Sequence, residues 1–171
     1  DTSLLPRREG TDGTNGAGHQ GPPLPVVVYG GGETGCETAE FLSAAGWHVV
    51  LVTRSRLDDL ARAAEPMYRR QLRKRLAANG HIRIMPLTTL AAIHGDRVSL
   101  QLAEGDDFDL RATALVMAQG RASSDVLVAP LRAAGVVHAV VGDARTIGRI
   151  GDAVHAAHDA VRVLAGGLSR I

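Results

Sequence analysis

The chain has 171 residues, of which 45% are hydrophobic and 3% aromatic, and its 19 Lys and Arg against 18 Asp and Glu give a formal net charge of +1. This balance excludes the strongly basic surface expected of a nucleic-acid or anionic-membrane binder, and the length suits one core or two small lobes. A single cysteine, Cys36, excludes an internal disulfide and an iron–sulfur cluster ligated by this chain alone.

The chain opens with a polar segment and then becomes a βαβ pattern. Residues 1–25 are rich in glycine and proline, which is typical of an extended linker. Apolar strands are predicted at 26–29 and 48–53, and they flank a glycine turn and a helix at 36–45. Two apolar strands joined by one helix predict a parallel pair with a right-handed crossover.

The next elements complete one nucleotide-binding-like domain, residues 26–120. A helix is predicted at 65–78 and a strand at 81–86, followed by an antiparallel hairpin at 98–110 and an apolar strand at 114–118. The predicted fold class is therefore α/β, with a Rossmann-like parallel sheet, a βαβ nucleotide-binding turn and an antiparallel β-hairpin.

The remaining residues, 121–171, predict a helix near 124–134, a strand at 136–141 and a final helix at 149–165. No apolar run approaches the roughly 18 residues of a membrane span. The first residues lack the apolar core of a signal peptide. We therefore expect a cytoplasmic protein with no membrane partner.

The glycine turn has the G-x-G-x-x-G spacing at Gly30, Gly32 and Gly35. The first glycine permits a tight turn, the second lets a pyrophosphate approach the backbone, and the third allows close helix–strand packing. Amides at the helix start then face the phosphates. The alternative is a turn kept for packing alone. The candidate cofactor-binding residues of this turn are Gly30, Gly31, Gly32, Glu33, Thr34 and Gly35.

The end of the second strand indicates which nucleotide binds. An acidic residue there would bind a ribose 2′-hydroxyl, but this chain has Thr53, Arg54, Ser55 and Arg56 instead. Hydroxyls and guanidiniums suit a 2′-phosphate, which favours NADP(H) over NAD(H) and makes Thr53, Arg54 and Arg56 candidate cofactor-binding residues. The alternative is a solvated basic loop without a ligand.

Three segments resemble the carboxy-terminal half of the trimethylamine dehydrogenase and 2,4-dienoyl-CoA reductase family. They are VVVYGGGETGCETAEFLSAAGWHVVLVT, ALVMAQGR and VVGDARTIGRIGDAVHAAHDA, and RREGTDGTN near the start also looks similar. That family joins an FMN-carrying barrel with an iron–sulfur cluster to a region resembling the two-dinucleotide fold of the disulfide reductases. The resemblance implies that 121–171 is a partial FAD-domain return segment, and it adds Gly120, Gly142 and Asp143 to the candidate cofactor-binding residues.

In the family the Gly142-Asp143 position meets the flavin ribityl chain, and the following helix points its amino end toward the flavin. The alternative for Asp143 is a simple turn residue. Because the first flavin glycine turn is missing, FAD binding is expected only if another chain completes the site. The expected partner is a flavin and iron–sulfur oxidoreductase subunit, or a second copy of this chain.

Other candidate features indicate less. His155 and His158 lie three residues apart without a third ligand, so no metal site is predicted. The basic run over residues 69–75 is usually a solvated face, although it could dock an acidic electron-transfer partner, and it lacks the interleaved aromatics of a single-strand binder. Cys36 has no C-x-x-C partner, and packing is favoured over redox catalysis.

No catalytic side chain is predicted, so any chemistry belongs to the cofactor. Two functions remain open. The first is a component of a flavin-dependent NAD(P)H oxidoreductase that passes hydride or electrons between nicotinamide and flavin. The second is a non-catalytic module that binds ADP or a similar nucleotide for assembly of a larger flavoenzyme.

Overall fold

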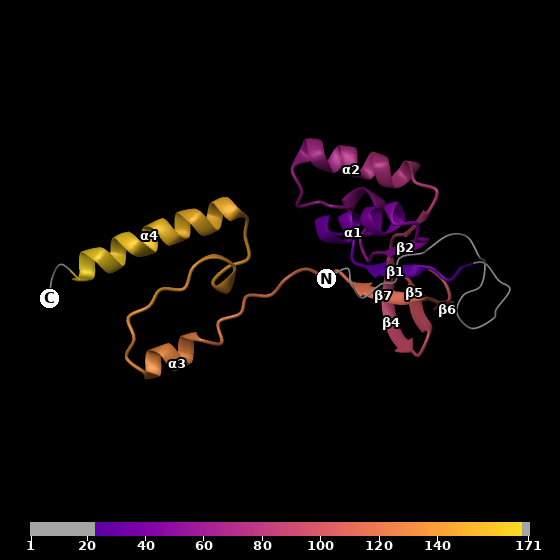
Figure 1. The fold of residues 1–171 in the computed structure, drawn as a ribbon. Helices are drawn as coiled ribbons and strands as arrows, with labels where there is room; N and C mark the ends of the chain where they lie inside the picture. Colours follow the sequence, from indigo (N-terminus) through magenta and orange to yellow (C-terminus); the bar gives the residue numbers. More distant parts are fainter. Residues whose placement is uncertain (1–22, 169–171) are drawn as a thin grey trace. The chain divides into compact units, whose positions relative to one another are not determined.

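The computed structural model describes residues 23–168, and the chain divides after Gly120 into two units (Figure 1). The first unit contains all the strands, and the second, from Arg121, contains only helices and irregular segments in its described part.

A parallel four-stranded sheet forms the centre of the first unit. Its strands are β1 (Val26–Tyr29), β2 (Val49–Val52), β3 (Ile82–Met85) and β7 (Ala114–Met117), in the order β3-β2-β1-β7. In register, Val28 of β1 lies beside Leu51 of β2 and Val116 of β7. The predicted Rossmann-like parallel sheet is confirmed.

Both faces of this sheet are covered, which explains why β1 and β2 are apolar throughout. On one face, Val28 and Leu51 are fully buried with Leu72 of helix α2. Figure 1 shows α1 (Glu33–Ala44) and α2 (Pro66–Ala78) together on this side. Alternate residues along each strand point to opposite faces, so the side chains of the neighbouring valines lie on the other face of the sheet.

A second sheet packs against this other face. It is antiparallel, in the order β4-β5-β6, and consists of β4 (Thr88–His94), β5 (Arg97–Leu102) and β6 (Phe108–Arg111). Val27 and Val52 from the parallel sheet form one buried cluster with Leu100 of β5. The predicted hairpin is present as β5 and β6, and β4 is an additional strand.

The two helices of the first unit begin and end for local reasons. α1 begins at Glu33, three residues earlier than predicted, because Gly32 has extended backbone and already serves as its N-cap. α2 begins at Pro66, one residue later than predicted, because Glu65 is its N-cap. The Glu65 carboxylate accepts a hydrogen bond from the Tyr68 amide (2.8 Å), and Pro66 occupies the first turn as predicted.

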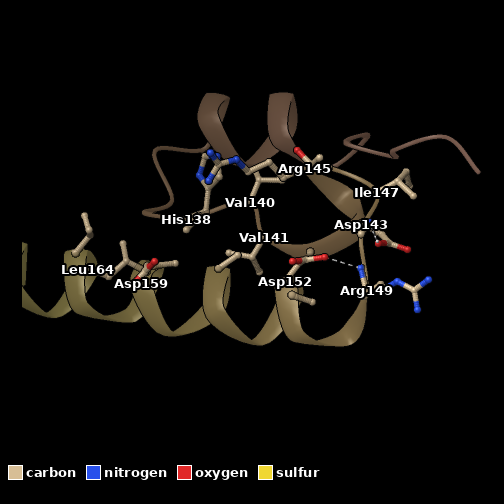
Figure 2. Close-up of a pocket in the computed structure, with 18 residues that line it drawn as sticks. His138, Val140, Val141, Asp143, Arg145, Ile147, Arg149, Asp152, Asp159 and Leu164 are labelled. Atoms are coloured by element: carbon tan, nitrogen blue, oxygen red, sulfur yellow. Dashed lines mark hydrogen bonds between the residues drawn. The ribbon is translucent and has the colours of Figure 1, made fainter. Parts of the chain in front are cut away.

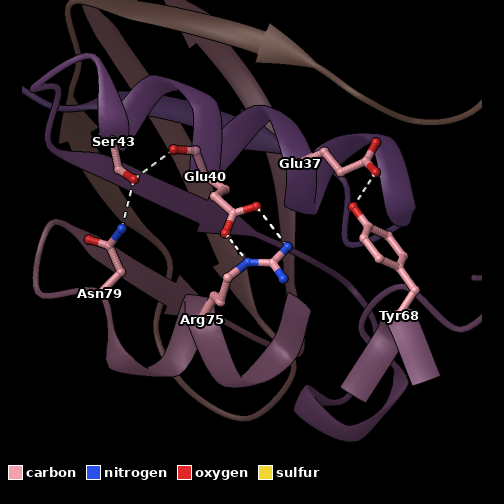
Figure 3. A network of polar contacts seen from close by, with 6 residues as sticks. All are labelled: Glu37, Glu40, Ser43, Tyr68, Arg75 and Asn79. Carbon is pink, nitrogen blue, oxygen red and sulfur yellow. Dashed lines mark hydrogen bonds and ion pairs between the residues drawn. The ribbon is translucent and has the colours of Figure 1, made fainter. Parts of the chain in front are cut away.

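Three side-chain pairs join α1 to α2 (Figure 3): Tyr68 with Glu37, Arg75 with Glu40, and Asn79 with Ser43. The Tyr68 hydroxyl donates to Glu37 at 2.5 Å, and the Asn79 amide donates to the Ser43 hydroxyl at 2.8 Å. Exposed pairs of this kind contribute about 0–1 kcal/mol each. Their main effect is to fix how α1, which begins at the glycine turn, lies against α2.

The second unit contains α3 (Val128–Ala133), the short 3-10 helix η3 (Gly142–Ala144) and α4 (Ile150–Leu168). The strand predicted at 136–141 is wrong, because this segment has no strand partner among the described residues. A strand needs a neighbour for its backbone hydrogen bonds, and an apolar sequence alone does not provide one. None of residues 121–166 is buried.

Candidate dinucleotide-binding site

Most of the predicted site residues meet at the carboxyl edge of the parallel sheet. Gly30 follows β1, Thr53 follows β2 and Gly120 lies three residues beyond β7. The Gly30 amide donates to the Val52 carbonyl (2.9 Å), which ties the glycine turn to the end of β2. In open α/β sheets, ligands bind at this edge.

Gly30 and Gly35 are positions where a side chain cannot fit. A Cβ at Gly30, whose φ is +138°, would lie 2.0 Å from the Ala118 carbonyl oxygen. A Cβ at Gly35 would lie 1.9 Å from the Gly30 carbonyl oxygen. The first and third glycines of the motif therefore allow the strand, turn and helix to approach one another closely.

Gly32 differs from the other two glycines of the motif. A Cβ built there meets no atom within 4 Å, and the residue is exposed. It is the N-cap of α1, and no side chain caps the first helical turn, where Glu33 and Thr34 lie. The turn thus presents open space beside helix-start amides, which is the arrangement that a pyrophosphate requires.

Gly31 has a structural role that the motif spacing did not reveal. A Cβ at Gly31 would lie 2.4 Å from the Thr53 hydroxyl oxygen and 3.0 Å from Leu60. Its carbonyl also accepts a hydrogen bond from the Ala61 amide (2.8 Å). Gly31 therefore lets the turn pack onto the segment that follows β2.

The three candidates after β2 have different environments. Thr53 is 2% exposed, and its hydroxyl accepts a hydrogen bond from the Ser55 amide (3.2 Å). Its side chain therefore stabilises the loop after β2 from a buried position. Arg54 and Arg56 are exposed and form no ion pair with any described residue. These two guanidiniums are the groups at this edge that could contact a phosphate.

Cys36 is a packing residue in this site. Its side chain is fully buried, and the thiol donates to the Gly31 carbonyl oxygen at 3.6 Å. Burial raises the pKa of the Cys36 thiol to about 11. The thiol is therefore protonated near neutral pH. Because the thiolate is the reactive form of cysteine, Cys36 is unreactive at this pH.

Gly142 and Asp143 lie in the second unit, where Asp143 organises a loop. Its carboxylate accepts hydrogen bonds from the Arg121 guanidinium (2.5 Å) and the Gly148 amide (3.1 Å). Beside this loop is a cavity of about 850 Å³ between residues 138–149 and helix α4 (Figure 2). Gly142 has a φ of +58°, which favours glycine at this bend.

Residues 23–168 contain no group of three or more His, Cys, Asp and Glu side chains arranged to hold a metal ion. Over the same range, none of the helices combines the length and apolar character needed to cross a membrane.

The parallel sheet and the glycine turn at its carboxyl edge define a dinucleotide-binding domain of the Rossmann type. Comparison with known proteins then identifies the family. Residues 10–146 match the family model described as pyridine nucleotide-disulphide oxidoreductase, and the chain belongs to that family.

Individual relatives agree with this assignment. An NADH oxidase from Thermoanaerobacter brockii is 34% identical over 130 residues, which is 75% of this chain and 20% of that protein. Histamine dehydrogenase from Rhizobium sp. 4-9 is 27% identical with a TM-score of 0.65, covering 80% of this chain and 22% of the other. The 6-hydroxypseudooxynicotine amine oxidase of Pseudomonas geniculata N1 is 25% identical with a TM-score of 0.68, covering 80% and 21%.

The chain thus spans about a fifth of the length of these relatives. The resemblance to the dinucleotide-binding region of the trimethylamine dehydrogenase family is confirmed.

Proposed function

We propose that residues 26–120 bind NADP(H), or NAD(H), and transfer reducing equivalents between the nicotinamide and a flavin held by a complementary region. The observation that carries this proposal is the contrast among the motif glycines. Gly30 and Gly35 are closed by backbone atoms within 2.0 Å of a built Cβ, whereas Gly32 has nothing within 4 Å. Such a turn reserves space for a pyrophosphate at its middle glycine.

The remaining residues would hold the rest of the nucleotide. Helix-start amides around Thr34 would bind the pyrophosphate, and Arg54 and Arg56 would bind the ribose 2′-phosphate. Gly120, with a φ of +98° and nothing within 4 Å of a built Cβ, leaves room at the same edge. The bound nicotinamide would supply the hydride chemistry, and the protein would supply binding and orientation.

The nucleotide preference is testable by charge reversal. We expect Arg54→Glu combined with Arg56→Glu to raise the Kd for NADPH at least about tenfold, which is 1.4 kcal/mol. The Kd for NADH should rise less, because NADH lacks the 2′-phosphate. Isothermal titration of both nucleotides measures the difference. Arg83→Glu with Arg97→Glu changes the net charge equally and serves as the control. Equal losses for NADPH and NADH would show that the two arginines do not contact the 2′-phosphate.

A second candidate function is binding of ADP or a similar nucleotide for assembly, without hydride transfer. In its favour, the turn and the loop after β2 would contact the pyrophosphate and the adenosine half of a dinucleotide, which ADP shares in part. Titration with NADPH, NADH and ADP distinguishes the two functions. A clear preference for reduced nicotinamides supports oxidoreductase function, and equal affinity for ADP supports the assembly module.

For the second unit we propose a contribution to an FAD site shared with another chain or region. Gly142 and Asp143 line the cavity of about 850 Å³ beside the start of α4. Apolar side chains of this unit are strongly exposed, including Ile150 (85%), Val137 (75%) and Val161 (64%). Apolar faces of this kind mark an interface. A flavin and iron–sulfur oxidoreductase region, or a second copy of this chain, would cover them.

We therefore expect the chain alone to bind no stoichiometric FAD and to self-associate, or to bind a flavoprotein partner through residues 121–171. A flavin site of this type needs its own glycine turn, and in residues 23–168 only the turn after β1 joins a strand to a helix in that way. Size-exclusion chromatography with light scattering, followed by flavin reconstitution, tests this expectation. A monomer that carries stoichiometric FAD would contradict it.

A further inference from the structure

The basic run on α2 divides into paired and unpaired side chains. Arg69 donates from Nε to the Leu60 carbonyl oxygen (2.9 Å). Arg73 forms a 2.7 Å ion pair with Asp58, and Arg75 pairs with Glu40. These three arginines hold the helix to neighbouring segments.

Arg70 and Lys74 are different. They lie one helical turn apart on the same face, both are exposed, and neither pairs with an acidic group among the described residues.

Both of these cations line a groove between α2, strand β3 and the 3-10 helix η2 (Leu57–Asp59). Its volume is about 440 Å³, within the range of small-molecule sites. Arg62 also lines it, and Leu57, Leu60 and Ile84 supply an apolar wall. The groove therefore combines cationic groups with an apolar surface.

The groove carries an excess of positive charge. Five of its lining residues are Lys or Arg, and the ion pairs that they form are between Arg73 and Asp58 and between Arg62 and Asp59, the latter at 3.6 Å. Five cations and two carboxylates leave an excess of three positive charges, whereas the formal net charge of the whole chain is +1. Local attraction for an anion follows from this distribution.

We propose that this groove is a second anion site, separate from the glycine turn, that binds a small organic phosphate. Arg70 and Lys74 contact the phosphate, and the apolar portion of the ligand packs against Leu57 and Ile84. A guanidinium fork and an ammonium group together suit a phosphate. The volume of the groove fits a small molecule, whereas a protein partner would bury about 800 Å² on each side.

The groove and the glycine turn share one segment of chain. Leu57 and Leu60 line the groove, and the next residue, Ala61, donates its amide to the Gly31 carbonyl (2.8 Å). A ligand at either place contacts the same short segment. The experiment must therefore separate binding in the groove from binding at the turn.

Lys74 is the only lysine in the chain, which makes a single-site footprint possible. The probe is phenyl phosphate, with inorganic phosphate and phenol as separate arms. We expect saturating phenyl phosphate to slow acetylation of Lys74 by acetic anhydride at least threefold. Inorganic phosphate should protect less, and phenol should not protect. Lack of protection by phenyl phosphate, or equal protection by phenol, would overturn the proposal.

Variants assign the binding to the groove. Arg70→Gln with Lys74→Gln should raise the Kd for phenyl phosphate at least tenfold by isothermal titration. Arg83→Gln with Arg97→Gln removes two positive charges elsewhere and should leave the Kd within twofold. Gly32→Val, which closes the proposed nucleotide space, should also leave it within twofold. A Kd for phenyl phosphate raised more than twofold in Gly32→Val, or in Arg83→Gln with Arg97→Gln, would overturn the proposal. Binding of polyglutamate in place of phenyl phosphate would overturn it as well.

Discussion

Gly35→Ala is expected to destabilise the first unit by about 3 kcal/mol or more, the upper part of the range for overpacking a core. The added Cβ would lie 1.9 Å from the Gly30 carbonyl oxygen and 3.3 Å from the Ala118 side chain. The first of these atoms belongs to the backbone of the turn, so α1 must move away from β1. Thermal unfolding followed by circular dichroism should show a Tm lower by about 10 °C or more.

Gly80→Ala is the matched control for that substitution. Gly80 lies outside the helices and strands, and a Cβ there meets no atom within 4 Å. We expect its Tm to stay within about 2 °C of the parent, because surface substitutions usually change stability by less than about 0.5 kcal/mol. A Gly35→Ala protein as stable as Gly80→Ala would show that the turn and α1 pack less closely than the structure indicates.

The elements with strong local signals were predictable from the sequence. The strands of the parallel sheet are continuous apolar runs because both faces of the sheet are buried, and α2 has Pro66 in its first turn and Asn79 just beyond its end. The sequence did not reveal β4. A register shift between Leu90 and Ala92 interrupts its alternation, so the period of two that indicates a strand is lost.

The strand predicted at 136–141 failed for a different reason. Its residues are suitable for a strand, but strand formation depends on a neighbouring strand that the described chain does not provide. The local sequence indicates whether a segment can adopt strand conformation, whereas strand pairing also requires a neighbouring strand. The same dependence explains the exposed apolar face of α4, where Val154 is 59% and Ile150 is 85% exposed.

The site was only partly predictable. The motif spacing indicated the three tasks of Gly30, Gly32 and Gly35. The close contacts at Gly30 and Gly35 agree with their packing tasks, and the pyrophosphate task of Gly32 stays a prediction. Nothing in the spacing indicated that Thr53 is buried beneath Gly31, because that contact depends on how the loop after β2 folds back. The division of the basic run on α2 into paired and unpaired cations likewise depends on tertiary contacts.

Gly32→Val is expected to abolish most nucleotide binding while the first unit stays folded. The backbone at Gly32 has φ −71° and ψ 177°, which valine adopts readily, and no atom lies within 4 Å of the new Cβ. The side chain would instead fill the space beside the helix-start amides, where the pyrophosphate would bind. The Kd for NADPH should rise at least about tenfold, equivalent to 1.4 kcal/mol.

The measurement combines isothermal titration with thermal unfolding, and Gly80→Val provides the control for adding a valine away from the turn. The free energy of unfolding of Gly32→Val should stay within about 1 kcal/mol of that of the parent, because a change at the N-cap has effects of that order. The same substitution should leave phenyl phosphate binding intact, because the groove beside α2 does not include Gly32. A folded Gly32→Val protein that binds NADPH, NADH and ADP as tightly as the parent would show that the open space at Gly32 is not the nucleotide site. The glycine turn would then serve only the close packing of β1 against α1.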